Sequence, residues 1–341
     1  MNKLIDIIKI ETREELYKNA SEIAASYDMT VDENTKLFCF FGDPASHSKS
    51  PKMYNEAFKY LDINGFYFAS RVPEGNIKSA IKKVRELGIK GLNISMPHKA
   101  SVIDELDEVA QSAILCNAVN TIVCTDENNR TYLKGYNTDS IGAVKALLES
   151  GVEIKDKRIV LLGLGGAGKS IAYGLASHGA AHIFVFIRNL YKSNYDFINN
   201  LSQIFPHTLI DVGYFDVLPS KAEISGNNLD FQKDMFINNT SLKDAIKEGN
   251  ILINATSVGM HSEDCAGKSD SIKELTLIPD ESYLNKDLSI MDVIYAPDKT
   301  ELLLLGEAVG CKVLINGLKM LRYQGEEAFK LFTGMEASIL P

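Results

Sequence analysis

Short apolar runs alternate with segments of helical periodicity along the first part of the chain. The runs at residues 36–42, 65–72 and 89–95 are short enough to be buried strands, and the segments at 50–63 and 75–88 carry apolar residues at helical spacing. Strands that alternate with helices in this way predict an α/β layer with a largely parallel sheet.

The same alternation continues in a second block of the chain. Residues 140–151 predict a helix, and residues 156–189 predict a complete βαβ unit of strand, glycine turn, helix and strand. Further along, we expect helices at about 193–204 and 317–334 and a variable loop around residues 224–228. Since 341 residues exceed the usual size of one hydrophobic core, the pattern predicts two domains.

The N-terminal segment is not typical of a secretory signal. Residues 1–27 carry acidic side chains within their apolar part and have no small-residue cleavage site. Their apolar residues recur at helical spacing, so we expect an added amphipathic helix. No apolar run in the chain approaches the roughly 20 residues that a membrane-spanning helix needs.

Composition restricts the partners further. The formal net charge of −9 argues against nucleic acid or an anionic membrane as the main partner, although a local pocket for a small anion stays compatible with it. The cysteines are odd in number and form no CxxC pair, which predicts reduced thiols in a cytoplasmic protein and no bound metal. They are Cys39, Cys116, Cys124, Cys265 and Cys311.

The glycine turn at residues 163–170, GLGGAGKS, fits two phosphate-binding motifs. As GxGxxG it would place a dinucleotide pyrophosphate on a helix N-terminus, and as GxxxxGK[ST] it would hold a triphosphate with Mg²⁺. Asp292 could supply the acidic Mg²⁺ ligand of a phosphotransferase, so the loop alone leaves both interpretations open. Its position in the middle of the chain, after a separate α/β block, favours the dinucleotide.

Lys99 is the most informative residue of that first block. It follows a strand-like run and Pro97, so its backbone has little freedom and its amine can be aimed. A carboxylate beside it would orient the amine, and Asp139 is the candidate. From the residues alone, a second interpretation is open, in which Thr138 or Asp139 simply caps the helix that starts at Ser140.

Eight short stretches, taken together and in this order, resemble the shikimate dehydrogenase family. The stretches are SHSKSP (46–51), NISMPHK (93–99), NAVNT (117–121), GYNTD (135–139), GLGGAG (163–168), NATSVGM (254–260), DVIYAP (292–297) and GLKMLRYQ (317–324). They extend from about residue 37 to residue 334. The chain is also similar to the quinate/shikimate branch of that family, in which Ser95 and Met96 precede Pro97.

This resemblance implies a two-domain α/β fold with the active site in the cleft. The N-terminal helical extension (1–36), which has no assigned counterpart in the family, would precede a substrate-binding domain (37–139 and 315–341) with a largely parallel sheet. A Rossmann-like NAD(P)-binding domain (140–314) would complete the chain. The implied reaction is the reversible reduction of 3-dehydroshikimate to shikimate in chorismate and aromatic amino-acid biosynthesis. Use of both quinate and shikimate is the alternative, and the P-loop phosphotransferase is a remote one.

The resemblance also carries functional residues onto this chain. The implied catalytic pair is Lys99 and Asp139. The implied substrate-binding residues are Ser48, Ser50, Ser95, Asn120, Tyr295 and Gln324. The implied cofactor-binding residues are Gly163, Leu164, Gly165, Gly166, Ala167, Ile187, Arg188, Asn189, Val293 and Gly317. His47 and His98 are left with structural roles, and no metal site is expected.

These residue types suit the implied chemistry. Hydride transfer to a ketone builds negative charge on oxygen, which an ammonium group can stabilise and protonate. Ser48 and Ser50 could hold a carboxylate, although hydroxyls at a helix start more often cap the helix. Tyr295 and Gln324 could equally be packing and surface residues. We expect a small-molecule enzyme that is a monomer or a homodimer.

The strand before Asn189 bears on the choice between NADP and NAD. An NAD site usually has an acid at the end of its second strand, to bind the ribose 2′-hydroxyl. Here the strand at 182–189, HIFVFIRN, has no acid at its end, and Arg188 could pair with a 2′-phosphate. The likeness to the quinate/shikimate branch favours NAD instead. We give more weight to the missing acid and predict NADP.

Overall fold

The computed structural model describes residues 3–127, 130–215, 240–260 and 276–338. The chain forms two compact units, of which unit 1 comprises residues 1–142 and 321–341 and unit 2 comprises residues 143–320. The boundaries fall within helix α5 (Asp139–Leu148) and helix α10 (Gly317–Thr333). The variable loop expected around residues 224–228, and Cys265, lie outside the described residues.

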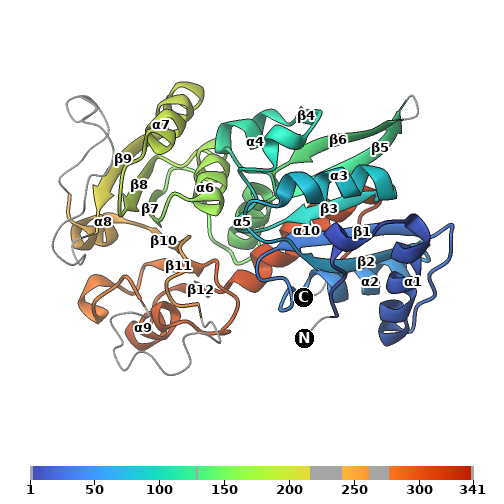
Figure 1. Cartoon of the computed structure of the whole chain (residues 1–341). Helices are drawn as coiled ribbons and strands as arrows, with labels where there is room; N and C mark the ends of the chain where they lie inside the picture. Colours follow the sequence, from blue (N-terminus) through green and yellow to red (C-terminus); the bar gives the residue numbers. More distant parts are fainter. Residues whose placement is uncertain (1–2, 128–129, 216–239, 261–275, 339–341) are drawn as a thin grey trace. The chain divides into compact units, whose positions relative to one another are not determined.

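Unit 1 is built on a six-stranded sheet (Figure 1). In spatial order its strands are β2 (Gly65–Arg71), β1 (Lys36–Gly42), β3 (Gly91–Ile94), β5 (Thr121–Glu127), β6 (Arg130–Tyr136) and β4 (Glu108–Val109). Strands β1, β2 and β3 are parallel, as their alternation with helices predicts. Strand β5 runs antiparallel to both β3 and β6, so a hairpin that the sequence pattern missed extends the parallel part.

Helices cover both faces of the unit 1 sheet. They are α1 (Arg13–Ala24), α2 (Ser50–Tyr60), α3 (Ile77–Leu87), α4 (Gln111–Cys116) and the part of α10 from residue 321 onward. Leu37 and Phe41 of β1 pack in a core with α1 and α3, whereas Phe38, between them, packs with α2 and α10. This alternation is the two-residue period of a strand that is buried on both faces.

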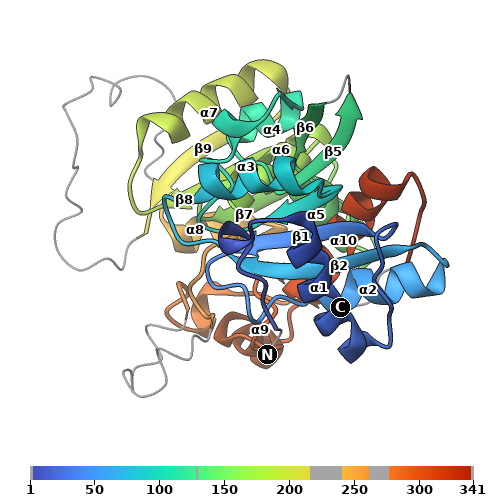
Figure 2. The ribbon, with the colours of Figure 1, turned by 45° about the vertical axis from the view of Figure 1, so that its right-hand side comes forward.

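The N-terminal segment joins the sheet before it forms a helix. Leu4 makes a parallel bridge to Ala69 of the edge strand β2, and the Ile5 N–H donates to the Ala69 carbonyl at 3.1 Å. The α-helix expected over residues 1–27 is therefore confined to α1, which lies beside β2 (Figure 2). An edge strand has unpaired backbone groups, and pairing with them outweighs the helical periodicity of the first residues.

Unit 2 contains a fully parallel sheet of six strands. In spatial order these are β9 (Leu209–Tyr214), β8 (His182–Ile187), β7 (Arg158–Leu162), β10 (Ile251–Asn254), β11 (Ser289–Asp292) and β12 (Val313–Ile315). Numbered along this unit, the order is 3-2-1-4-5-6, which is the strand order of a Rossmann fold. The direction of winding reverses between β7 and β10, and ligands of such sheets bind beyond the carboxyl ends of those strands.

The remaining elements of unit 2 connect these strands. Between the described strands lie α6 (Gly166–Ser177), α7 (Lys192–Ile204), α8 (Leu242–Glu248) and α9 (Glu301–Val309). Helix α6 lies within the predicted βαβ unit, and α7 lies close to the helix predicted at about 193–204. Short 3₁₀ turns complete the described chain at Ile7–Lys9, Ala25–Tyr27, Ile103–Glu105 and Glu281–Tyr283. Within the described ranges, no helix is both long enough and apolar enough to cross a membrane.

The N-terminal segment should contribute to the stability of unit 1. Leu16 of α1 is completely buried, so Leu16→Ala should lower the free energy of unfolding by about 2–5 kcal/mol. Tyr60 is 88% exposed, so Tyr60→Ala serves as the control and should stay close to wild type. Urea denaturation measures both. An unchanged transition for Leu16→Ala would show that the segment is only an appendage.

Candidate active site

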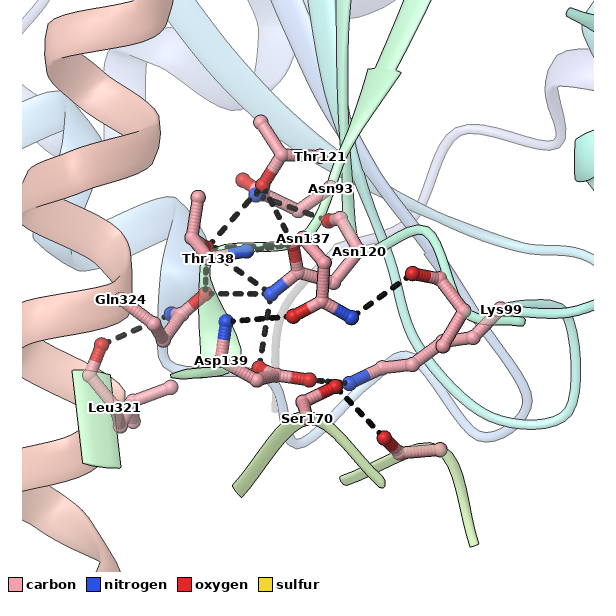
Figure 3. A network of polar contacts seen from close by, with 12 residues as sticks. Asn93, Lys99, Asn120, Thr121, Asn137, Thr138, Asp139, Ser170, Leu321 and Gln324 are labelled. Carbon is pink, nitrogen blue, oxygen red and sulfur yellow. Dashed lines mark hydrogen bonds and ion pairs between the residues drawn. The ribbon is translucent and has the colours of Figure 1, made fainter. Parts of the chain in front are cut away.

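A network of buried polar side chains lies at the ends of several elements of unit 1 (Figure 3). We call it the polar network, and it consists of Asn93, Lys99, Asn120, Thr121, Asn137, Thr138, Asp139 and Gln324. Its members come from β3 and the loop after it, from the start of β5, from the start of α5 and from α10. Buried polar groups are costly unless they are hydrogen-bonded. The hydrogen bonds between these side chains therefore hold the elements together.

Lys99 and Asp139 form an ion pair within this network. The Lys99 Nζ lies 2.5 Å from the Asp139 Oδ2, and the two side chains are 19% and 8% exposed. The Lys99 carbonyl accepts a hydrogen bond from the Val119 N–H at 2.8 Å, and this bond fixes the loop that carries Lys99. A carboxylate so enclosed needs its cation, whereas the ammonium group keeps some access to solvent and hence to a ligand.

Asn120 holds the other oxygen of Asp139. Its Oδ1 accepts from the Thr138 N–H at 2.9 Å, and a backbone N–H can only donate, so the orientation of the amide is fixed. The Asn120 Nδ2 then donates to the Asp139 Oδ1 at 2.8 Å. One carboxylate oxygen is therefore held by the amide, and the other is left to face Lys99.

Gln324 and Asn93 close the network on two further sides. The Gln324 Oε1 lies 3.4 Å from both the Asn120 Nδ2 and the Thr138 Oγ1. Asn93 donates to the Thr121 Oγ1 at 3.1 Å and accepts from the Tyr67 hydroxyl at 2.8 Å. Asn93 is not among the site residues predicted from the sequence, although an amide inside an apolar strand is a signal that could have identified it.

The two serines lie at the start of α2. The Ser50 N–H donates to the Ser48 Oγ at 3.3 Å, and Ser50 is buried. Burial raises the pKa of the Tyr67 hydroxyl well above its usual range, while hydrogen bonds with Asn93 and Ser50 act in the opposite direction. Tyr67 is connected to the polar network through Asn93.

Ser95 and His98 lie in the turn between β3 and Lys99. The Ser95 N–H donates to the Phe41 carbonyl at 2.8 Å, and Ser95 is half-buried. The His98 ring is buried with its Nε2 2.6 Å from the Val72 carbonyl, which is a structural contact. Tyr295 belongs to unit 2 instead, on the segment after β11, where burial raises the pKa of its hydroxyl.

The glycines of the turn after β7 occupy three different environments. Gly163 has a φ of +91°, which disfavours other residues, and a Cβ there would lie 2.6 Å from the Thr256 Cγ2. A Cβ on Gly168 would lie 2.3 Å from the Gly163 carbonyl oxygen, whereas a Cβ on Gly165 would meet nothing within 4 Å. Turn, open approach and helix packing are the three glycine roles of a dinucleotide site.

Other residues that we assigned to the cofactor lie in this turn, at the start of α6, or after β11 and β12. Leu164 is buried, and Gly166 and Ala167 begin helix α6, whose N-terminal N–H groups suit a pyrophosphate. Gly317 begins α10 and contacts the segment after β11. Its N–H donates to the Ile294 carbonyl at 2.9 Å, and a Cβ on it would lie 2.0 Å from the Val293 carbonyl oxygen. Only glycine permits this close contact.

The end of β8 carries a positive charge. Ile187 is buried and Arg188 is exposed, and no ion pair joins Arg188 to another described residue. Lys192 is different, because its Nζ lies 2.6 Å from the Asp196 Oδ2. The Asn189 Nδ2 donates to the Tyr191 hydroxyl at 3.3 Å. This end of β8 therefore suits an anion.

The contacts of the P-loop residues do not support the phosphotransferase interpretation. The Lys169 Nζ donates to the Ser193 carbonyl at 3.1 Å, and the Ser170 Oγ donates to the Gly166 carbonyl within α6 at 2.8 Å. Asp292, the expected acidic Mg²⁺ ligand, is fully buried and accepts from the Thr300 Oγ1 at 2.7 Å. The described residues contain no group of three or more potential metal ligands.

Comparisons with known proteins bear on the whole chain. Residues 40–122 match the model of the shikimate dehydrogenase substrate binding domain. The chain is 36% identical to a Streptococcus pyogenes protein named shikimate dehydrogenase (NADP(+)), over 90% of this chain and 94% of that relative. The match at this identity and coverage concerns both units rather than one motif.

Solved structures resemble the fold as well. A shikimate 5-dehydrogenase from Listeria monocytogenes, in complex with shikimate and NAD, aligns with a TM-score of 0.72 and 30% identity, covering 92% of this chain and 96% of that one. A quinate dehydrogenase from Corynebacterium glutamicum, in complex with NAD, aligns with a TM-score of 0.68 and 26% identity, covering 89% and 95%.

The environments of the glycines predict different effects for two alanine variants. Gly165→Ala should fold like wild type but bind NADPH at least about tenfold more weakly, because its methyl group would fill the open approach. Gly168→Ala should lower the melting temperature, because its methyl group would overlap the Gly163 carbonyl. Thermal denaturation and NADPH fluorescence titration separate the two effects. Wild-type NADPH affinity in Gly165→Ala would rule out a pyrophosphate at this turn.

Proposed function

This chain belongs to the shikimate dehydrogenase family, and on that premise we propose that it catalyses the reversible NADP-dependent reduction of 3-dehydroshikimate to shikimate. This is a step of chorismate and aromatic amino-acid biosynthesis. The observation that carries the proposal is the Lys99–Asp139 ion pair inside the buried polar network of unit 1. Unit 1 contains the residues that match the substrate binding domain, and we assign it to the substrate.

In the proposed mechanism, the Lys99 ammonium group acts on the substrate carbonyl. A nicotinamide bound to unit 2 would supply the hydride for the carbonyl carbon. Lys99 stabilises the charge that develops on the carbonyl oxygen and gives that oxygen its proton. In the reverse direction, the neutral amine accepts the hydroxyl proton. Asp139 orients the amine, and Asn120 holds Asp139 in place.

Further residues, from unit 1 and in the case of Tyr295 from unit 2, would bind the substrate. We propose that Ser48 and Ser50, at the start of α2, hold the substrate carboxylate. Their placement supports this, because Ser50 is buried at the start of α2 and its N–H donates to the Ser48 Oγ at 3.3 Å. We propose that Ser95, Asn120, Tyr295 and Gln324 bind ring hydroxyls or fix the ring. Asn120 and Gln324 are both members of the polar network.

Unit 2 fits the dinucleotide. Its strand order and its glycine turn suit a pyrophosphate at the N-terminus of α6, held by Gly163, Leu164, Gly165, Gly166 and Ala167. Ile187, Arg188 and Asn189 would bind the adenosine ribose, with Arg188 on the 2′-phosphate. Val293 and Gly317 would lie near the nicotinamide. The NADP-specific name of the Streptococcus relative agrees with this assignment.

Shikimate is favoured over quinate as the substrate. The curated Streptococcus relative at 36% identity is named for shikimate, and among the solved structures the Listeria shikimate 5-dehydrogenase is 30% identical and the quinate dehydrogenase 26%. We also propose a cytoplasmic location. It is supported by Cys39, Cys116, Cys124 and Cys311, which form no disulfide within the described part of the chain. A monomer or a homodimer remains our prediction for the assembly.

Lys99→Met tests the catalytic assignment. The change keeps the aliphatic stem but removes the charge, so kcat for shikimate oxidation with NADP⁺ should fall by about 10²- to 10⁴-fold. Lys90→Met is the control, because Lys90 forms an equally short ion pair of 2.5 Å with Asp126 in the same unit. Absorbance of the reduced nicotinamide measures both. If Lys99→Met keeps a near-normal kcat, Lys99 is not the general acid.

Arg188→Ala tests the cofactor assignment. Wild type should prefer NADP⁺, and the ratio of kcat/KM for NADP⁺ to that for NAD⁺ should fall at least about tenfold in the variant. Lys192→Ala is the control, because Lys192 is paired with Asp196 and should leave the ratio nearly unchanged. A wild type that prefers NAD⁺, or an unchanged ratio in Arg188→Ala, contradicts the assignment.

A further inference from the structure

One buried carboxyl group of unit 2 has no part in the mechanism above. Asp292, the last residue of β11, is 0% exposed, and no ion pair joins it to a cation of the described chain. Burial raises the pKa of this carboxyl, and its hydrogen bonds oppose that effect. Burying a carboxyl group without a nearby cation costs free energy, so other contacts must stabilise it.

The Asp292 carboxylate accepts hydrogen bonds from three different places. Its Oδ1 accepts from the Ile294 N–H at 3.0 Å and from the Asn254 Nδ2 at 3.1 Å. Its Oδ2 accepts from the Thr300 Oγ1 at 2.7 Å. A carboxylate is the only side chain of this size that accepts at both oxygens and donates at neither, so it matches three converging donors.

Asn254 extends this arrangement to the glycine turn. Its Oδ1 accepts from the Thr256 N–H at 3.1 Å, so its Nδ2 must face Asp292. Thr256 in turn packs on Gly163, since a Cβ at Gly163 would lie 2.6 Å from the Thr256 Cγ2. The carboxylate after β11 is therefore connected, through one amide, to the loop after β10 and to the turn after β7.

Ile294 and Thr300 connect Asp292 to the segment that follows β11. Thr300 directly precedes α9. The hydrogen bonds that Ile294 and Thr300 donate to Asp292 therefore fix both ends of the segment between β11 and α9. This segment begins with Val293, whose carbonyl lies against Gly317, and it includes Tyr295. Asp292 thus fixes the backbone on which both of these predicted contact residues lie.

We propose that Asp292 is a positioning residue for the dinucleotide, which holds the loops after β7, β10 and β11 in their binding arrangement. The proposal rests on the proposed function, because that function places the dinucleotide on these loops. Asp292 touches neither the cofactor nor the substrate in this role. It acts through Asn254 and through the segment from Val293 to Thr300.

The test compares two substitutions of Asp292 with a matched control. Asp292→Ala removes all three acceptor contacts and should raise the Kd for NADPH, measured by fluorescence titration without shikimate, at least about tenfold. Asp292→Asn keeps one acceptor oxygen, and the Thr300 hydroxyl can rotate to accept, so the Kd should rise no more than about threefold. Hydrogen exchange of residues 293–300 should become faster in Asp292→Ala and stay near wild type in Asp292→Asn.

Asp211→Asn is the control for a general loss of stability. The Asp211 Oδ2 lies 2.9 Å from the His182 Nε2 within the same sheet. Asp211→Asn weakens this contact, so it should lower the melting temperature without changing the Kd for NADPH. The proposal is overturned if Asp292→Ala binds NADPH like wild type, or if Asp211→Asn weakens binding as much as Asp292→Ala. If Asp292→Ala does not fold, Thr300→Val replaces it and should raise the Kd for NADPH at least about threefold. An unchanged Kd in Thr300→Val would then overturn the proposal. A wild type that binds NADPH but does not oxidise shikimate contradicts the proposed function alone.

Discussion

The ion pair of Lys99 with an almost buried Asp139 is the interaction on which the arrangement of unit 1 depends. Removing one partner of such a pair typically costs about 3–5 kcal/mol, because the other charge stays buried without compensation. The loop after β3, the start of β5, the start of α5 and helix α10 must all meet to enclose the carboxylate. The residues that the reaction needs are therefore also residues that the fold needs.

The same constraint operates in unit 2 with different chemistry. Asp292 is enclosed by donors rather than by a cation, so its carboxylate fixes loops without offering a charge to a ligand. In both units the buried carboxyl group lies where the chain leaves the sheet. Asp139 follows β6 at the start of α5, and Asp292 is the last residue of β11. Side chains placed there can set the conformation of several loops at once, because the parallel strands end side by side.

Much of this architecture could be predicted from the sequence, and the exceptions have physical reasons. The glycine turn and the aimed Lys99 have strong local signals, because backbone geometry restricts the residue types there. The β5–β6 hairpin was missed because polar residues interrupt its apolar pattern. The N-terminal strand pairing of Leu4 and the hydrogen bonds of Asn93 depend on partners about 65 and 28 residues away, which no local pattern contains.

The discontinuity of unit 1 has a consequence for synthesis on the ribosome. Helix α10 supplies Gln324 to the polar network and Phe329 to the core beneath α2, and both are translated after the residues of unit 2. Unit 2 is by then complete in sequence and free to fold. A chain stalled before α10 can therefore have a finished Rossmann sheet but no finished catalytic unit, so unit 1 can be completed only once α10 has been translated.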